Sequence, residues 1–302
     1  LTVIAGDNNT GKSTIGKVLF TLFHSLRNMP QLVLEERKSV IRSFFSVLLR
    51  RDSDRYRLLR MIEMEGMSDL FNGFDTKVES VQSWYEVLLH NLAEVLHLEL
   101  SEDDKENFKL KIKEALEPSD EEIEKSLVGN AFFDMFAGQS NSVYGEAEAR
   151  ISLCVQGKEK EAVFQANECK EYKSGIELLE DAIYVDDPFL IDQCFHPRIR
   201  GLGIETNPLR KSLISYLETD DRPGVIEGLE IKRKLSEIFS LFQQIVPGNI
   251  TREKRRFVLE LDDQDGVLNV ENWSAGIKSF AILKRLLENG TLHEKGVLIL
   301  DE

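Results

Sequence analysis

The feature that most constrains the fold lies near the amino terminus. Gly6-Asp-Asn-Asn-Thr-Gly-Lys-Ser13 matches the pattern G-x-x-x-x-G-K-[S/T]. An apolar run at residues 1–5 precedes it and predicts a buried strand, and a helical pattern begins at Lys12. A glycine-rich turn between a strand and a helix directs backbone N–H groups and the positive helix end toward one point. The segment therefore predicts a phosphate-binding loop in an α/β fold.

Each residue of this loop has an expected role. Lys12 is expected to reach the β- and γ-phosphates and to act in catalysis, and the Ser13 hydroxyl is expected to bind Mg²⁺. The predicted nucleotide-binding residues of the loop are Gly6, Asn8, Asn9, Thr10, Gly11, Lys12, Ser13 and Thr14.

The helix after the loop is expected to be amphipathic. Its predicted apolar stripe consists of Ile15, Val18, Leu19, Leu22 and Phe23. Met29-Pro30 is expected to end this helix, because the residue before proline disfavours the helical conformation.

The carboxyl end of the sequence carries a second pattern. Val297–Leu300 is an apolar strand followed by Asp301 and Glu302. A buried parallel strand would deliver Asp301 at its carboxyl end, beside the loop, where it can hold Mg²⁺ through water. Glu302 is then the expected general base for the attacking water. Residues 182–188 have nearly the same form and are an alternative source of the metal ligand; the other interpretation is a strand that leaves the sheet through a proline turn.

A third segment lies 27 residues before Asp301 and opens a helix. Ser274-Ala-Gly-Ile-Lys-Ser279 resembles the S-G-G-[EQ]-[KR]-S signature motif of ABC-class ATPases of the SMC- and RecF-like branch. It departs from that motif at Ala275 and Ile277. The Asn8-Asn9 pair and the run that ends at Glu302 are also similar to OLD-like ATPases of prokaryotic DNA repair and phage defence. The resemblance covers about 1–28 and 145–302.

The resemblance implies a fold and a mechanism. The fold would be an ABC-type P-loop ATPase head, α/β with a mixed sheet and antiparallel hairpins, a large helical insertion and a helical second lobe. Two heads would meet head to tail, and ATP on the loop of one would be closed by Ser274, Ala275 and Gly276 of the other. Mg²⁺ would be held by Ser13 and Asp301, and the single chain would be a weak ATPase. A glutamine that senses the γ-phosphate could be any of three, namely Gln156, Gln165 or Gln193.

Secondary-structure patterns divide the remaining chain. Residues 31–129 read mainly as helix, with helix starts at Ser101 and Ser119. Hairpins are expected at 149–165 and 257–270, and further helices at 209–245 and 275–287. The predicted domains are an ATPase head (1–30, 146–190 and 255–302), a helical insertion (31–145) and a helical lobe (191–254), and the sequence is expected to be truncated after Glu302.

Composition disfavours binding that depends on a general positive charge. The net charge of −15 gives no general attraction to DNA or anionic lipid, and no apolar run approaches the length of a membrane span. Three cysteines and five histidines show no metal-ligand spacing, which favours a reduced, cytoplasmic protein without a Cys/His metal site.

Three interpretations of function remain open. The preferred one is an ATP-hydrolysing head in DNA maintenance or anti-phage defence, with a second copy, an effector nuclease or toxin subunit, and DNA as candidate partners. The second is an ATP-bound scaffold that holds such an effector without turnover. The third is the nucleotide-binding subunit of an ABC transporter, which the helical block directly after the loop disfavours. A small GTPase is disfavoured as well, because Asp263–Gly266 is expected to form a hairpin turn and no base-reading motif is present.

Overall fold

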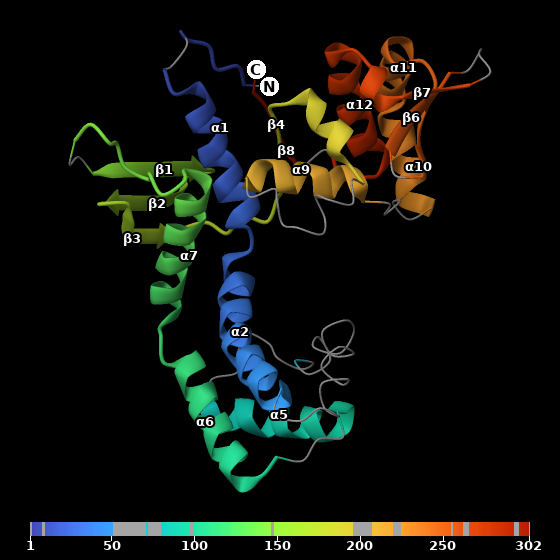
Figure 1. Cartoon of the computed structure of the whole chain (residues 1–302). Helices are drawn as coiled ribbons and strands as arrows, with labels where there is room; N and C mark the ends of the chain where they lie inside the picture. Colours follow the sequence, from blue (N-terminus) through green and yellow to red (C-terminus); the bar gives the residue numbers. More distant parts are fainter. Residues whose placement is uncertain are drawn as a thin grey trace. The chain divides into compact units, whose positions relative to one another are not determined.

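The protein is described by a computed structural model of the chain (Figure 1). The structure describes residues 2–7, 10–50, 71, 80–96, 100–145, 148–195, 207–219, 225–254, 256–261, 266–292 and 296–301. Within these ranges the protein is mixed α/β, with one two-stranded parallel sheet and two three-stranded antiparallel sheets. The chain forms two compact units. The first contains 1–27, 131–138 and 179–302, and the second contains 28–130 and 139–178.

A parallel pair of strands, β4 (Ala182–Val185) and β8 (Val297–Leu300), lies at the centre of the first unit. Alternate residues of a strand face opposite sides of a sheet. On one side, Tyr184 and Ile299 pack with Phe20 of α1 (Lys12–Phe20). On the other side, Ile183 and Val185 join a larger core. Helices therefore cover both faces of this pair, as expected where strands are parallel.

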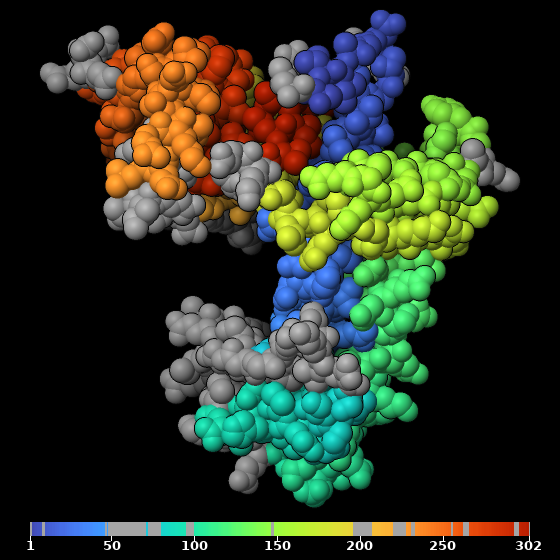
Figure 2. Space-filling view, turned by 180° about the vertical axis from the view of Figure 1, so that it is seen from behind, coloured from blue at the N-terminus to red at the C-terminus, as the bar shows by residue number. Residues whose placement is uncertain are grey.

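The stretch of chain between β4 and β8 supplies most residues of the larger core. Its helices are α9 (Pro208–Glu218), α10 (Val225–Lys234), α11 (Ser236–Ile245) and α12 (Ala275–Glu288), with short 3₁₀ segments η3 (Pro188–Gln193) and η4 (Val270–Asn272). Its antiparallel sheet consists of β5 (Asn249–Glu253), β6 (Arg256–Glu260) and β7 (Val267–Asn269). Phe257 and Leu259 of β6 pack with Trp273, just before α12. Helices α10 and α11 contribute the orange surface in Figure 2.

The second unit combines helices with a meander of three strands. Its helices are α2 (Met29–Arg50), α5 (Val81–Leu96), α6 (Glu102–Leu116) and α7 (Asp120–Met135), whose last turn belongs to the first unit. Its strands are β1 (Ala149–Val155), β2 (Lys158–Gln165) and β3 (Glu168–Ser174). Phe45, Trp84 and Phe108 are fully buried where α2, α5 and α6 pack together.

Many predicted elements are confirmed. The helix starts at Ser101 and Ser119 are capped as expected, and Ser119 and Glu122 exchange hydrogen bonds in a capping box. Both predicted hairpins form, but each is extended by a strand that the sequence patterns did not indicate, β3 in one case and β5 in the other. The predicted turn residue Asp265 lies outside the described residues.

The buried strand predicted at residues 1–5 is not observed in the described part of this segment, residues 2–5. Residues 2–5 have no regular secondary structure and belong to none of the described sheets, and Val3 and Ile4 are 79% and 47% exposed. A strand needs a neighbour for its backbone N–H and C=O groups. The described partners of this sheet, β4 and β8, pair with each other and not with residues 2–5.

Two details of the first helix also differ from prediction. The buried residues of α1 are Gly16 and Phe20, whereas Ile15 of the predicted stripe is 45% exposed. The helix continues as a π-helical turn (η1, Thr21–Ser25), in which Leu26 N bonds to Thr21 O; this wider turn rotates the following residues away from the ideal helical face.

Met29-Pro30 begins a helix and does not end one. The η1 segment stops at Ser25, and α2 starts at Met29. Proline is tolerated in the first turn of a helix, where its missing N–H has no intrahelical partner. Asn28, with a φ of 51°, separates the two helices.

The compact units group the segments differently from the predicted domains. Strands β1–β3 belong with the helical block, and the described parts of 191–254 belong with α1. Compactness reflects contacts and not function, so the predicted nucleotide-binding domain stays a prediction. None of the described helices is long and apolar enough to cross a membrane.

Candidate phosphate-binding site

The amino end of α1 has the features of an anion site. Gly11 adopts a left-handed conformation, with a φ of 89°, and no side chain caps the helix. The first N–H groups of a helix have no intrahelical partner, so an uncapped start leaves them available to an anion. By contrast, Ser101 caps α6 and Asn207 caps α9 through their side-chain oxygens. The start of α1 therefore lacks the side-chain cap that those helices have.

The loop before α1 is organised by its own side chains. Lys12 Nζ donates to the carbonyl oxygens of Gly6, at 2.6 Å, and Asp7, at 2.8 Å. Thr10 Oγ1 also donates to Asp7 O, at 2.8 Å. Thr10 is exposed, as are Ser13 and Thr14 of the first turn of α1. The ammonium group thus lies over the loop that was predicted to surround phosphate.

The two ends of the sequence meet at this loop. Ser13 Oγ donates to Asp301 Oδ1 at 3.1 Å, across 288 positions of sequence. Asp301 directly follows β8, and its backbone N–H bonds to Val185 O of β4 at 3.0 Å. The predicted pair of metal-binding residues is therefore in direct contact.

A tyrosine that the sequence analysis did not single out completes this contact. The Tyr184 hydroxyl, from β4, donates to Asp301 Oδ2. Burial of the Tyr184 ring, together with this hydrogen bond, raises the pKa of the hydroxyl well above its usual range, so it keeps its proton and remains a donor. No local sequence signal marked Tyr184, because a tyrosine in an apolar strand is an ordinary core residue.

Asp186 and Asp187, the alternative metal ligands, have different surroundings. Asp186 follows β4 as Asp301 follows β8, and it is exposed at the same edge of the sheet. Asp187 caps η3 by accepting from Phe189 N, and Arg210 lies 3.4 Å from its other oxygen. Ser13 donates to Asp301, which favours Asp301 as the metal ligand.

The residues present fit a magnesium–nucleotide complex. Mg²⁺ prefers oxygen ligands, keeps several waters, and is commonly held by one or two carboxylates together with substrate phosphates. The described residues contain no group of three or more His, Cys, Asp or Glu side chains that could hold a metal by themselves. The hydroxyl of Ser13 and the carboxylate of Asp301 therefore suit Mg²⁺ that arrives with a phosphate.

The segment that resembles a signature motif forms an exposed helix start. Ser274 Oγ accepts from Ile277 N at 3.3 Å and caps α12, as predicted. Ser274, Ala275 and Gly276 are all exposed, and a Cβ added to Gly276 would meet no atom within 4 Å. Ile277 departs from the motif but packs against the larger core. The first turn of α12 therefore offers open backbone to an approaching group.

Some predicted residues lie outside this geometry. Asn8, Asn9 and Glu302 are outside the described residues. Among the three candidate glutamines, Gln193 belongs to the first unit, at the end of η3 after β4, whereas Gln156 and Gln165 belong to the second unit.

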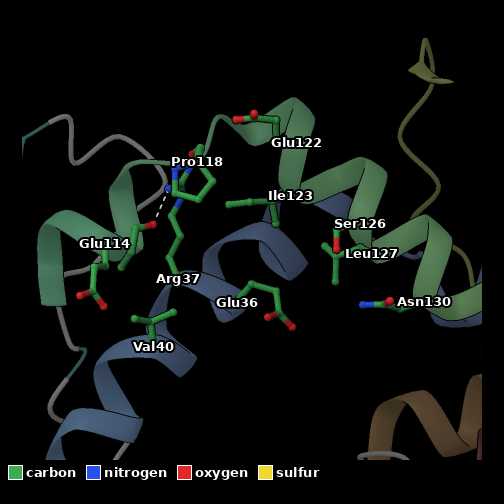
Figure 3. Close-up of a pocket in the computed structure, with 11 residues that line it drawn as sticks. Glu36, Arg37, Val40, Glu114, Pro118, Glu122, Ile123, Ser126, Leu127 and Asn130 are labelled. Carbon is green, nitrogen blue, oxygen red and sulfur yellow. Dashed lines mark hydrogen bonds between the residues drawn. The ribbon is translucent and has the colours of Figure 1, made fainter. Parts of the chain in front are cut away.

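The second unit contains a separate pocket of about 330 Å³, which holds none of the predicted site residues (Figure 3). It lies between α2 and the corner of α6 and α7. Arg37 at its edge donates to Ala115 O, Pro118 O and Asp120 Oδ1, so its guanidinium fastens the corner. The pocket is therefore explained by helix packing and is not a candidate catalytic site.

Comparison with known proteins adds no further assignment. No protein-family model matches the chain, and no significant match is found among curated proteins or solved structures.

Proposed function

We propose that this protein binds and hydrolyses Mg-ATP as an ABC-type head that dimerises around the nucleotide. The observation that carries the proposal is the contact between Ser13 Oγ and Asp301 Oδ1. Two motifs from opposite ends of the sequence, each expected to bind the same magnesium ion, are adjacent in the fold. Chance would not favour this pairing.

The chain's own groups divide the work of the site. The uncapped start of α1 and the loop amides bind the phosphates, and Lys12 exchanges its loop carbonyl partners for phosphate oxygens. Ser13 and Asp301 hold the metal. When bound, Mg²⁺ neutralises charge on the phosphates. Glu302, adjacent to Asp301 in sequence, orients and deprotonates water.

The second half of the site comes from another molecule. The first turn of α12 presents Ser274, Ala275 and Gly276, whose exposed backbone suits a γ-phosphate held by a partner copy. Dimerisation therefore depends on ATP, and turnover depends on both copies. The pathway we propose, DNA maintenance or anti-phage defence in the cytoplasm, with DNA or an effector nuclease or toxin subunit as partner, rests on the sequence resemblance.

Complementation between two inactive variants tests this arrangement. Lys12→Ala disables the loop, and Ser274→Arg blocks the helix start, so each variant alone is expected to lose turnover. An equal mixture is expected to recover about a quarter of the wild-type rate, because half of the dimers are mixed and one of their two sites is intact. Steady-state ATP hydrolysis of the intact protein measures this.

A matched control separates the site from helix capping. Ser101 caps α6 as Ser274 caps α12. Loss of either cap is expected to lower the free energy of unfolding by about 1 kcal/mol. Ser101→Arg is expected to keep wild-type turnover. Failure of the mixture to recover any activity would reject the shared site. Wild-type dimerisation on Mg-ATP without turnover would instead favour the scaffold interpretation.

The assignment of the base has its own test. Glu302→Gln is expected to abolish hydrolysis and to preserve ATP-dependent dimers, measured by light scattering. Hydrolysis that survives this change would remove Glu302 from the proposed mechanism.

A further inference from the structure

Both oxygens of the Asp301 carboxylate are held by donors from different elements. Ser13 Oγ of α1 donates to Oδ1 at 3.1 Å, and the Tyr184 hydroxyl of β4 donates to Oδ2. A carboxylate that accepts one hydrogen bond can still rotate about its Cβ–Cγ bond. Two donors on opposite oxygens fix the plane of the group.

The position of the tyrosine is itself fixed by packing. Tyr184 is 2% exposed, and its ring meets Phe20 edge to face, with centroids 6.2 Å apart. Helix α1 approaches it closely at Gly16, where an added Cβ would lie 2.9 Å from Tyr184 Cε2 and 3.2 Å from Ile299 Cγ2. The absence of a side chain at residue 16 therefore permits this contact between α1 and the sheet, and the ring has little room to turn.

We propose that Tyr184 is a positioning residue, which orients the Asp301 carboxylate toward the magnesium ion of bound Mg-nucleotide. The inference rests on the proposed function, because it needs a metal at Ser13 and Asp301. Groups that hold a metal ligand in place commonly change metal affinity by about 10- to 100-fold when they are removed. Tyr184 touches neither the nucleotide nor the metal in this proposal and acts only through Asp301.

The same unit contains a matched control. Tyr216 of α9 is a second tyrosine whose hydroxyl donates to an aspartate, Asp181 Oδ2, at 2.6 Å. Asp181 precedes β4, so this pair lies at the end of the strand away from Asp301. Each Tyr→Phe change removes one hydroxyl and one hydrogen bond to a carboxylate, but only Tyr184→Phe removes a bond to Asp301.

The experiment measures nucleotide binding against magnesium concentration in the intact protein. ATP affinity is determined by equilibrium binding in the wild type and both variants, in excess EDTA and across a Mg²⁺ titration. For Tyr184→Phe, the Mg²⁺ concentration that gives half of the affinity gain is expected to rise about tenfold. Affinity in EDTA is expected to be unchanged, and Tyr216→Phe is expected to follow the wild type in both conditions.

A second variant moves the ring without removing its hydroxyl. Gly16→Ala places a methyl group against Tyr184 and Ile299. Like Tyr184→Phe, it is expected to raise the Mg²⁺ concentration that gives half of the gain in ATP affinity. It keeps the inference testable if Tyr184→Phe does not fold.

The results separate the two proposals. If the wild type gains affinity with Mg²⁺ and Tyr184→Phe has the same Mg²⁺ dependence, the inference is overturned while the proposed function stands. An equal shift in Tyr216→Phe also overturns it, because the effect would then be a general loss of packing. If the wild type binds no ATP, the proposed function fails and the inference fails with it.

Discussion

Lys278 of α12 donates from Nζ to both carboxylate oxygens of Asp192, at 2.7 Å to Oδ1 and 2.5 Å to Oδ2. The lysine is 1% exposed, and its ammonium also lies 4.6 Å from the centre of the Phe189 ring. Asp192 belongs to η3, which follows β4. This ion pair therefore fastens the helix that begins at Ser274 to the segment that leaves the central strands.

Removing one partner of this pair is expected to be costly. Asp192→Leu leaves the Lys278 ammonium buried without its carboxylate, and we expect a loss of about 3 kcal/mol in the free energy of unfolding. The double variant Lys278→Met with Asp192→Leu is expected to lose much less than the sum of the single changes. Urea denaturation of the wild type, the single variants Asp192→Leu and Lys278→Met, and the double variant forms a double-mutant cycle. Strictly additive losses would contradict the buried pair.

Glycine is required at residue 248 for two reasons. Gly248 has a φ of 109°, and an added Cβ would lie 2.0 Å from Glu260 O. Gly266 has a φ of 126° but open space around it, so it controls for conformation alone. We expect Gly266→Ala to lower the free energy of unfolding by about 1 kcal/mol, and Gly248→Ala to lower it by about 3 kcal/mol or more. Thermal denaturation measures the difference, and equal losses would show that the close approach to β6 is relaxed.

Acid is expected to weaken the first unit through Asp181. Burial by itself raises the pKa of this carboxyl. Hydrogen bonds from His24 and Tyr216, together with the nearby charge of Arg27, lower the pKa by more than burial raises it, so it lies below its ordinary value of 3.8. The folded carboxyl binds its proton more weakly than the unfolded one. Its contribution to stability is therefore fully present above about pH 5 and is lost as the pH falls below about 4.

Asp181→Asn tests this pH dependence. The variant is expected to be less stable than the wild type at pH 6, and to lose less stability between pH 6 and pH 3. Urea denaturation at each pH gives both curves. If the free energies of unfolding of the two proteins fall in parallel between pH 6 and pH 3, the pKa of Asp181 is not lowered.

Lys160 of β2 is a buried cation with no hydrogen-bond acceptor at its Nζ within the described ranges. Its ammonium lies 5.6 Å from the centre of the Tyr172 ring, and burial lowers its pKa. Removing an unpaired buried charge removes a desolvation cost, so we expect Lys160→Met to stabilise the protein by about 1–2 kcal/mol. Thermal denaturation measures the change. Destabilisation would indicate that Glu124, whose charge acts on Lys160, pairs with it in solution.

Local patterns predicted local structure well. The α12 cap at Ser274, the capping box at Ser119 and strands β4 and β8 follow from short-range rules of capping and hydrophobicity. Those rules failed where neighbours intervene. The described residues of the apolar run, 2–5, form no strand with β4 or β8, and a π-helical turn changed the buried face after α1.

The candidate site shows the same division. The residue types and spacing at Gly6–Ser13 and at Asp301 are sufficient to predict phosphate and metal chemistry. Tyr184 could not be recognised in that way, because a tyrosine in an apolar strand is an ordinary core residue. Its role depends on which carboxylate lies across the neighbouring strand, and pairing between distant strands is not encoded in local pattern.

The sequence by itself determined which groups are available: a glycine-rich loop before a helix, an acid after an apolar strand, and a capped helix start with small residues. Only the tertiary structure decided that Ser13 and Tyr184 hold opposite oxygens of Asp301, and that Gly16 permits α1 to approach the sheet. The physical reason is that secondary structure follows from interactions over a few residues. The site instead depends on the parallel pairing of β4 with β8 and on the packing of one helix face against them.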